Sequence, residues 1–501
     1  MNTILGLDFG TQGAKGVIIT PDGLSRSYAY SPYSIITKTG GIAEENPADW
    51  LIALKDICVQ LELNDKTAFD SISAIGVSGQ MHGFVPVDKN GTPVMNAMIW
   101  MDNRAVSECE AVEKALDTAD DMTAVNPVTG TYSAPKILYL YKNLPEIIKK
   151  TWKLLFVKDY IKFVLCRSTH TDHSDASGTL LYNFREGKWD ESLLSELGIS
   201  SGILPDIESS LKQCGGLHQS IASALGLKSG IPVINGAGDL ASGILGSGVV
   251  DSGQLLIMLS TSGQVMSINR GKSFVPLKGT HYFKYPDGMN IFALTSMPSA
   301  GMCLKWLSDI LFKDMHKERD DIFSYMEYIA NQSNIGSSGL LFMPYLQGAG
   351  NPHLDNCAAS SFIGLRAYHQ QSDFIRAVME GVSFGLREAV ESMGILYSEV
   401  LLAGGGAKSP LWSSMIADVL KSRLITVGVK DVSSFGAALI AATSIGVFDD
   451  FMSASKVVQT NKVIECTSES SIRYDEIYNI YKGMYSSLKM ANKQLDDLYL
   501  K

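Results

Sequence analysis

The chain has 501 residues, too many for one ordinary hydrophobic core, so its length predicts two large domains. Its 42 Lys and Arg against 52 Asp and Glu give a net charge of −10, and the basic residues are scattered, which excludes a nucleic-acid partner. An anionic cofactor can still bind, because backbone N–H groups at glycine-rich turns hold phosphate without net positive charge.

The N-terminus and the cysteines predict a cytoplasmic protein. The seven cysteines are widely spaced and include no Cys-x-x-Cys pair, which indicates buried, reduced thiols. The sequence begins MNTILGLDFG, without the basic segment of a signal peptide. No run of 18 apolar residues occurs, so we expect no membrane span.

Two strand–turn–strand units are predicted, one in each half of the chain. The first has strands over residues 4–7 and 17–20 around a glycine turn, and the second has strands over 255–259 and 265–268 around a Ser/Thr/Gly turn. This repetition predicts a duplicated architecture with a phosphate-facing hairpin in each half. We place the domain boundary near 248–252, which divides the chain into residues 1–249 and 250–501.

The first hairpin carries an acid at the end of its apolar strand. Asp8 is followed by Gly and Thr, a pattern that suits metal–phosphate chemistry, because the carboxylate can hold a Mg²⁺ shell while backbone N–H groups approach phosphate. An Asp-x-Gly turn alone is more often just a hairpin turn. A partly similar turn occurs at residues 260–263, which favours a pair of hairpins that hold phosphate between them.

A polar loop, Ser78-Gly79-Gln80-Met81-His82-Gly83, follows the apolar strand 75–77. Gln and His at a strand end offer donors and acceptors to sugar hydroxyls. A lone His is more often a structural residue, but the flanking glycines favour a binding loop.

A carboxylate, Asp239, ends the loop after the strand 231–234 and precedes a Gly-rich helix. In such a loop it can be partly desolvated and can accept a proton from an alcohol. The alternative interpretation, a helix N-cap ahead of Leu240, is compatible with catalysis.

The C-terminal half predicts several helices. Ser372 is the expected cap of a helix from Asp373, a buried helix is expected over 435–445, and a polar surface helix is expected from Glu469 on. The turn Gly404-Gly405-Gly406 precedes a helix with Ser409 as N-cap and Pro410 at its first position. That turn is either a ligand site or a tight strand-to-helix connection, and neither a P-loop nor a G-x-G-x-x-G motif is present.

Taken together, these motifs resemble the FGGY carbohydrate kinases of the actin/hexokinase/heat-shock-70 superfamily, over almost the whole chain. The motifs that carry the resemblance are LDFGTQGAKGVII, LSTSG, LLAGGGAKSPLW and SSFGAALIAA. Four further segments are most similar to the xylulokinases of that family: SGQMHG, IWMDNRA, PKILYLYKNLPE and SDASGTLLYNF.

The resemblance implies two actin-like (ribonuclease H-like) α/β lobes around an interlobe cleft, with the sugar mainly on the N-terminal lobe and ATP mainly on the C-terminal lobe. Asp239 would be the catalytic base, and Gln80, Met81 and His82 would contact the sugar. Asp8 would organise Mg²⁺. The expected nucleotide contacts are Thr11, Gln12, Thr261 and Gly263 at the phosphates, and Trp306, Gly405, Gly406, Ala407 and Pro410 near the adenosine.

Three positions depart from the xylulokinase pattern and bear on the sugar. Leu240 follows Asp239 where those enzymes usually have Asn, the segment 348–352 reads GAGNP where they have Gly-Glu-Arg-x-Pro, and Tyr139 replaces a Trp. The expected reaction is phosphorylation of D-xylulose to D-xylulose 5-phosphate. The alternatives are a kinase of another ketose, a heptulose, an alditol or a sugar acid, and, more remotely, an actin- or chaperone-like ATPase switch. Whether the chain forms a homodimer is left open.

Overall fold

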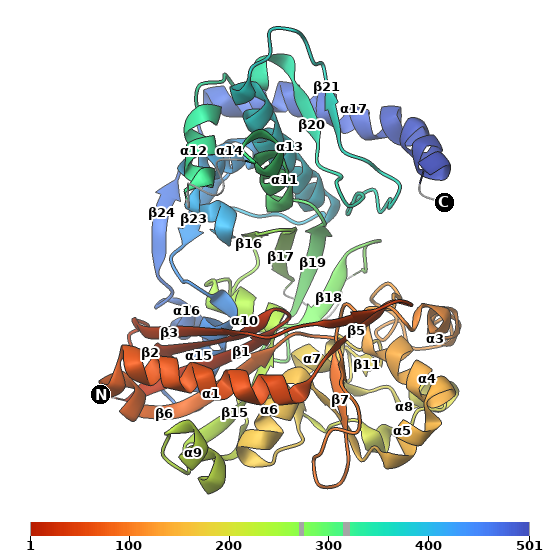
Figure 1. The fold of residues 1–501 in the computed structure, drawn as a ribbon, viewed down its shortest axis with the longest axis vertical. Coiled ribbons are helices and arrows are strands. Elements are labelled where there is room, and N and C mark those ends of the chain that lie inside the picture. The colour runs from red at the N-terminus through yellow and green to blue at the C-terminus, as the bar shows by residue number, and fades with distance from the viewer. Residues whose placement is uncertain (1, 270–274, 314–320, 500–501) are drawn as a thin grey trace.

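Two α/β bodies, each built on one central mixed sheet, make up the computed structural model, which describes residues 2–269, 275–313 and 321–499 (Figure 1). The first sheet has the strand order β14-β15-β6-β1-β2-β3 and the second β18-β19-β17-β16-β22-β23-β24. The first is formed by β1 (Thr3–Gly10), β2 (Gly13–Ile19), β3 (Ser25–Pro32), β6 (Ile72–Gly79), β14 (Gln213–Gly216) and β15 (Pro232–Gly238). The second is formed by β16 (Gln254–Leu259), β17 (Gly263–Asn269), β18 (His281–Lys284), β19 (Ile291–Met297), β22 (Glu399–Ala403), β23 (Arg423–Val427) and β24 (Thr460–Ile464).

Five strands of each sheet repeat one topology. In β3-β2-β1-β6-β15 the first two pairings are antiparallel and the next two parallel, and β19-β17-β16-β22-β23 has the same order and directions. The duplication predicted from the two hairpins is therefore present, and β1–β2 corresponds to β16–β17.

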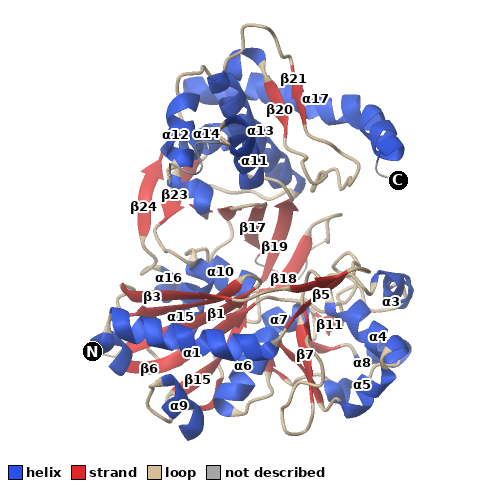
Figure 2. Cartoon of the chain, in the orientation of Figure 1, coloured by secondary structure: helices blue, strands red, loops and turns tan. Residues whose placement is uncertain are grey.

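Helices cover the faces of both sheets, and an insertion follows the first sheet's strand β6 (Figure 2). The helices of the first body are α1 (Pro47–Asn64), α2 (Lys66–Asp70), α6 (Val157–Cys166), α9 (Gln219–Leu225) and α10 (Asp239–Gly246). The insertion contains α3 (Cys109–Leu116), α4 (Ser133–Asn143), α5 (Pro145–Lys150), α7 (His173–Ser177) and α8 (Glu191–Leu197). The chain after β17 adds α11 (Gly301–Leu311), α12 (Ile322–Ala330), α13 (Gln371–Ser392), α14 (Pro410–Leu420), α15 (Val432–Ser444), α16 (Phe451–Ser455) and α17 (Ser468–Tyr499).

Smaller sheets complete the architecture. A five-stranded sheet, β4-β5-β8-β7-β9, flanks the first body, and three two-stranded sheets pair β10 with β13, β11 with β12 and β20 with β21. Their strands are β4 (Ile36–Lys38), β5 (Ile42–Glu45), β7 (Phe84–Val87), β8 (Ala97–Met98), β9 (Lys153–Phe156), β10 (Thr171–Asp172), β11 (Tyr182–Asn183), β12 (Lys188–Trp189), β13 (Ile207–Glu208), β20 (Leu341–Met343) and β21 (Ser361–Ile363).

Helix α15 belongs to the C-terminal half of the sequence but packs on the first sheet, among its strands in Figure 1. Glycines allow the close approach: a Cβ on Gly6 of β1 would lie 2.0 Å from the Ser434 carbonyl oxygen, and one on Gly76 of β6 would lie 2.0 Å from that of Ala437. Any side chain at either position would push the helix off the sheet. The chain thus crosses back to the first body after β23, and the division at residues 249 and 250 stays a prediction.

Several local predictions are corrected by the structure. Gln370, not Ser372, caps α13, because the Gln370 side chain and Asp373 form a reciprocal capping box. Helix α15 begins at Val432 with Asp431 as its cap, three residues earlier than expected. Helix α17 is not simply a surface helix, since it buries Tyr474, Tyr478 and Tyr481.

The structure can be compared with two expectations from the sequence, namely buried, reduced cysteines and the lack of a membrane span. All seven cysteines carry free thiols, but only Cys58 and Cys303 are buried, so the prediction of buried thiols was wrong for the other five. Within residues 2–269, 275–313 and 321–499, no helix has the length and apolar character that crossing a membrane requires.

Candidate active site

Parallel pairing brings three sequence-predicted segments to one edge of the first sheet. Strands β1, β6 and β15 lie side by side, with Asp8 opposite Ser78 and Ser78 opposite Ala237. The strands therefore end together, and Gln80 and Asp239 follow directly on the ends of β6 and β15. Residues 8, 80 and 239 are far apart in sequence, and the sheet places them at one edge.

Asp8 is buried beside a lysine. Its Oδ2 atom lies 3.7 Å from the Lys15 ammonium, which also pairs with Asp431 at 2.7 Å. Within the described part of the chain, its Oδ1 atom is buried without a hydrogen-bond partner. Burial raises the pKa of Asp8 to about 6, and Lys15 opposes the rise. An unsatisfied carboxylate oxygen of this kind suits a cation.

Asp239 is the first residue of α10 rather than the end of a loop, and the N-cap is Gly238. One of its carboxylate oxygens, Oδ1, accepts a hydrogen bond from the Leu240 N–H at 2.8 Å, and Ser433 of α15 donates to its carbonyl oxygen at 3.1 Å. Burial, followed by the negative charge of Asp8, raises the pKa of Asp239 to about 7. A carboxyl with this pKa can act as a general base near neutral pH.

This pKa predicts a pH-dependent effect on stability. The folded protein binds the Asp239 proton more tightly than the unfolded chain, whose carboxyl has a pKa near 3.8. The contribution of the protonated carboxyl to folding stability is therefore lost as pH rises from about 4 through about 7. We expect Asp239→Asn, which is neutral at every pH, to raise Tm relative to the natural protein more at pH 8 than at pH 5. Thermal unfolding without ATP or divalent ions measures this, and equal differences at the two pH values would contradict it.

Gln80 follows the end of β6, but its side chain is buried rather than exposed at that edge of the sheet. Its amide nitrogen donates to Glu45 Oε2 at 2.9 Å, and Thr11 Oγ1 lies 3.5 Å from its amide oxygen. The same Glu45 oxygen accepts the indole N–H of Trp50 at 2.8 Å. Gln80 therefore connects the loop after β6 with the β1–β2 turn, and its neighbour Met81 is buried as well.

His82 is neutral and its tautomer is fixed. Its Nδ1 atom lies 2.6 Å from the Gly178 carbonyl oxygen, which can only accept, so Nδ1 carries the proton. Burial lowers the pKa of His82 to about 3. The Nε2 atom is therefore a hydrogen-bond acceptor, which can receive a hydrogen bond from a ligand hydroxyl.

An aromatic cluster around His82 was not predicted from the sequence. The His82 ring lies 4.7 Å from the Tyr132 ring and 5.7 Å from that of Phe283, and the Tyr132 hydroxyl lies 2.5 Å from His281 Nδ1. His281 and Phe283 come from β18 in the second sheet, so this cluster joins the two bodies. The alternating aromatic residues of 281–285 are the one signal in the sequence that could have indicated it.

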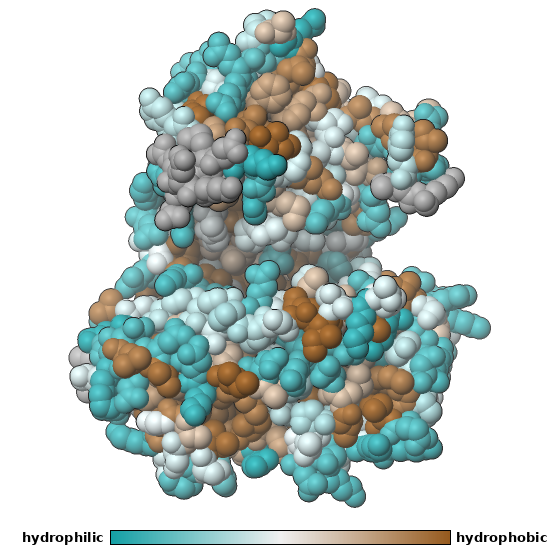
Figure 3. Space-filling view, viewed as in Figure 1, coloured by the Kyte–Doolittle hydropathy of each residue, from teal (hydrophilic) through white to brown (hydrophobic). Residues whose placement is uncertain are grey.

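The second hairpin and the glycine turn lie together at the edge of the second sheet. Strands β16 and β22 are parallel, with Met258 opposite Ala403, so the turns that follow them are neighbours. Thr261 is exposed at the tip, and its carbonyl oxygen accepts from Ala300 N at 3.0 Å and Met302 N at 3.1 Å, where α11 begins. Gly263 begins β17. The indentation between the two bodies is visible in Figure 3.

The predicted adenosine residues are only partly brought together. Gly405 and Ala407 lie in a short 3₁₀ turn after β22, and Ser409 caps α14 with Pro410 at its first position, as predicted. Trp306 stacks on Phe342 and lines a cavity of about 660 Å³ between α11, β21 and α17. The residues that line this cavity do not include Gly405, Gly406 or Ala407.

Of the predicted phosphate contacts in the first hairpin, Gln12 is exposed beside Thr11, and Trp100 donates its indole N–H to Thr11 Oγ1 at 2.8 Å.

No group of three or more His, Cys, Asp or Glu side chains that could hold a metal occurs among residues 2–269, 275–313 and 321–499. Mg²⁺ commonly takes one or two carboxylates and fills the rest of its shell from phosphate and water, so this finding is compatible with the expected magnesium site at Asp8.

Comparison with known proteins gives consistent matches. The model of the N-terminal domain of the FGGY family of carbohydrate kinases matches residues 3–246, and that of its C-terminal domain matches residues 255–445. The chain is 33% identical to the xylulose kinase of Staphylococcus xylosus over 497 residues, 97% of this chain and 100% of that protein. A ligand-bound xylulose kinase from Lactobacillus acidophilus has a TM-score of 0.89 at 25% identity, covering 99% of this chain and 100% of that one. A gluconate kinase from the same organism has a TM-score of 0.89 at 25% identity, covering 99% of both chains.

Proposed function

The chain belongs to the FGGY family of carbohydrate kinases and is a sugar phosphotransferase, and we propose that it transfers the γ-phosphoryl group of ATP to D-xylulose, giving D-xylulose 5-phosphate. The observation that carries the catalytic part of the proposal is the position of the Asp239 carboxyl, whose pKa is raised to about 7, at the sheet edge where Asp8 also lies. The sugar would bind mainly at the first body and ATP mainly at the second.

Asp239 is the proposed base. It accepts the proton of the attacking hydroxyl as that oxygen bonds to the γ-phosphorus and the bond to the ADP oxygen breaks. Its pKa of about 7 keeps a large fraction of the group deprotonated near neutral pH while leaving it basic enough to take the proton. The two bodies would hold hydroxyl and phosphate in line and exclude water.

Asp8 is the proposed ligand of Mg²⁺, and its buried, unpartnered oxygen fits that role. The ion would neutralise charge on the β- and γ-phosphates. Thr11, Gln12, Thr261 and Gly263 are the proposed phosphate contacts, because the two hairpins that carry them correspond in the duplicated fold.

The adenosine is proposed to lie against Gly405, Gly406 and Ala407 in the turn beside the second hairpin, and against Pro410 at the start of α14. For Trp306 this role rests on the family resemblance alone, since it lines a separate cavity.

His82 and Met81 are the proposed sugar contacts, with the His82 Nε2 atom accepting from a hydroxyl. Gln80 is engaged by Glu45 and Thr11, so we propose that it supports the sugar site by fixing the loop that carries Met81 and His82.

D-xylulose is the proposed sugar because relatives that match nearly the whole chain are xylulose kinases. The similar gluconate kinase structure makes a sugar acid the alternative to test first. Leu240 bears on this choice, since an apolar side chain beside the base cannot hydrogen-bond a hydroxyl.

We therefore expect the natural protein to phosphorylate D-xylulose but to discriminate less strongly against other sugars than a protein with an amide side chain at position 240. Leu240→Asn should sharpen the preference for D-xylulose over other ketoses and alditols severalfold. The measurement is kcat/KM for both proteins over D-xylulose, other ketoses, heptuloses, alditols and gluconate.

If the natural protein already rejects every alternative and Leu240→Asn does not tighten selection, Leu240 faces away from the sugar. If gluconate turns over and D-xylulose does not, the proposed substrate is wrong and the kinase assignment stands without it.

A further inference from the structure

The short segment formed by α7 and Gly178, residues 173–178, touches three parts of the proposed site. The Ser174 hydroxyl accepts a hydrogen bond from the Gly238 N–H at 2.9 Å, directly before Asp239. The Gly178 carbonyl oxygen fixes the His82 tautomer at 2.6 Å. Ser177 Oγ accepts from the Lys284 N–H of β18 at 2.9 Å. One segment thus contacts the turn before the base, the sugar-site histidine and a strand of the other body.

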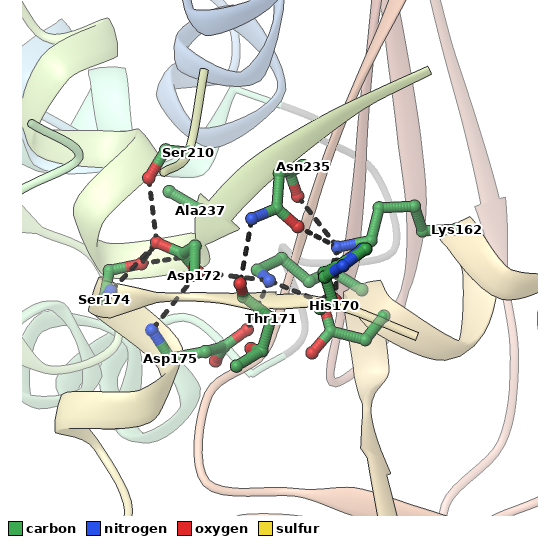
Figure 4. Close-up of polar contacts among 12 residues, drawn as sticks. Lys162, His170, Thr171, Asp172, Ser174, Asp175, Ser210, Asn235 and Ala237 are labelled. Carbon is green, nitrogen blue, oxygen red and sulfur yellow. Dashed lines mark hydrogen bonds and ion pairs between the residues drawn. The ribbon is translucent and has the colours of Figure 1, made fainter. Parts of the chain in front are cut away.

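A buried charge cluster holds this segment in place. The Lys158 ammonium lies 2.6 Å from Asp159, 3.1 Å from Asp172 and 3.3 Å from Asp175, and all four side chains are at most 1% exposed. Asp172 also caps α7 by accepting from the Ser174 N–H at 2.9 Å (Figure 4). Lys158 of α6 contacts both Asp172 and Asp175, and removing its ammonium would leave these buried carboxyls without a countercharge, so Lys158 ties α7 to α6.

Ser174 connects the cluster to the turn before the base. Its hydroxyl donates to Asp172 Oδ2 at 2.6 Å, which commits its proton to the carboxylate and turns its lone pairs toward Gly238. Ser210 donates to the same Asp172 oxygen at 2.9 Å (Figure 4). Both serines are buried, but only the Ser174 side chain also reaches the Gly238 N–H.

We propose that Ser174 is a positioning residue for phosphoryl transfer, fixing the end of β15 so that α10 presents the Asp239 carboxylate to the sugar hydroxyl. This inference rests on the proposed role of Asp239. Without the Ser174 hydroxyl, the Gly238 N–H is a buried donor that lacks this acceptor, and the turn moves to find another. Displacement of a catalytic group reduces the chemical step more than it reduces binding.

The test compares Ser174→Ala with the matched variant Ser210→Ala. Each removes one hydrogen bond to Asp172 Oδ2, but Ser174→Ala also removes the acceptor of the Gly238 N–H, so it should lose at least as much stability in thermal unfolding as Ser210→Ala. We expect Ser174→Ala to lower kcat about tenfold with KM for ATP within about twofold, and Ser210→Ala to keep kcat within about twofold. Hydrogen exchange should quicken at the Gly238 amide in Ser174→Ala and stay unchanged there in Ser210→Ala.

Equal losses of kcat in the two variants, or unchanged exchange at Gly238 in Ser174→Ala, would overturn the inference and leave Ser174 a structural residue. The variant Asp239→Asn distinguishes failure of the inference about Ser174 from failure of the proposed function on which it rests. If Asp239→Asn abolishes turnover while the two serine variants behave alike, only the inference fails. If Asp239→Asn retains its turnover, Asp239 is not the base and the role of Ser174 fails with it. If the natural protein phosphorylates no sugar, the proposed function fails as well.

Discussion

Asp239→Asn should lower kcat by about 10²–10⁴-fold, the usual contribution of a general base, while binding of ATP and sugar changes little. The amide keeps the size of the side chain and can still accept the hydrogen bond from the Leu240 N–H. It cannot take a proton from the sugar hydroxyl, because a neutral amide is not a base at physiological pH. Steady-state kinetics, with calorimetry of both ligands, measures the two effects separately.

The stability of this variant provides the control. Because burial makes the charged form of Asp239 unfavourable, Asp239→Asn should unfold at the same or a higher temperature at neutral pH. A loss of kcat below about tenfold in a folded variant would remove Asp239 from the role of base. A large loss accompanied by weak binding of both ligands would instead indicate a distorted cleft.

Much of the fold could be predicted because its signals are local. The hairpins around Asp8 and Thr261 are read from apolar runs interrupted by glycine turns, and they proved to be corresponding elements of a duplicated sheet. Ser409 and Pro410 predicted the start of α14 correctly, since capping depends on neighbouring residues. At α13 the predicted cap, Ser372, was wrong by two residues, because the reciprocal bonds of Gln370 with Asp373 cap the helix instead.

Long-range contacts could not be predicted in this way. The sequence indicates that 435–445 is a buried helix, but not that it packs on β1 and β6, because nothing local pairs Gly6 with Ser434. The meeting of Tyr132 with His281 likewise depends on how β18 docks on the other body. In the same way, the pKa of Asp239 is a property of its burial and of Asp8, which the sheet alone brings to the same edge.

The glycine turn at 404–406 provides a test of the proposed nucleotide site, because its positions differ in the space around them. A Cβ on Gly405 would meet no atom within 4 Å, whereas one on Gly406 would lie 2.4 Å from the Leu259 side chain. We expect Gly405→Val to weaken ATP binding on the order of a hundredfold, since its side chain would occupy the space proposed for the adenosine. Sugar affinity and Tm should change little.

Gly406→Val is the matched comparison. Its side chain must displace Leu259 at the end of β16, so it should lower Tm and weaken ATP binding at least partly through the distorted turn. Calorimetry with ATP and with the sugar, and thermal unfolding of both variants, distinguishes these effects. If Gly405→Val binds ATP as the natural protein does, the open space beside Gly405 faces solvent and the adenosine lies elsewhere, with the cavity beside Trp306 as the next place to test.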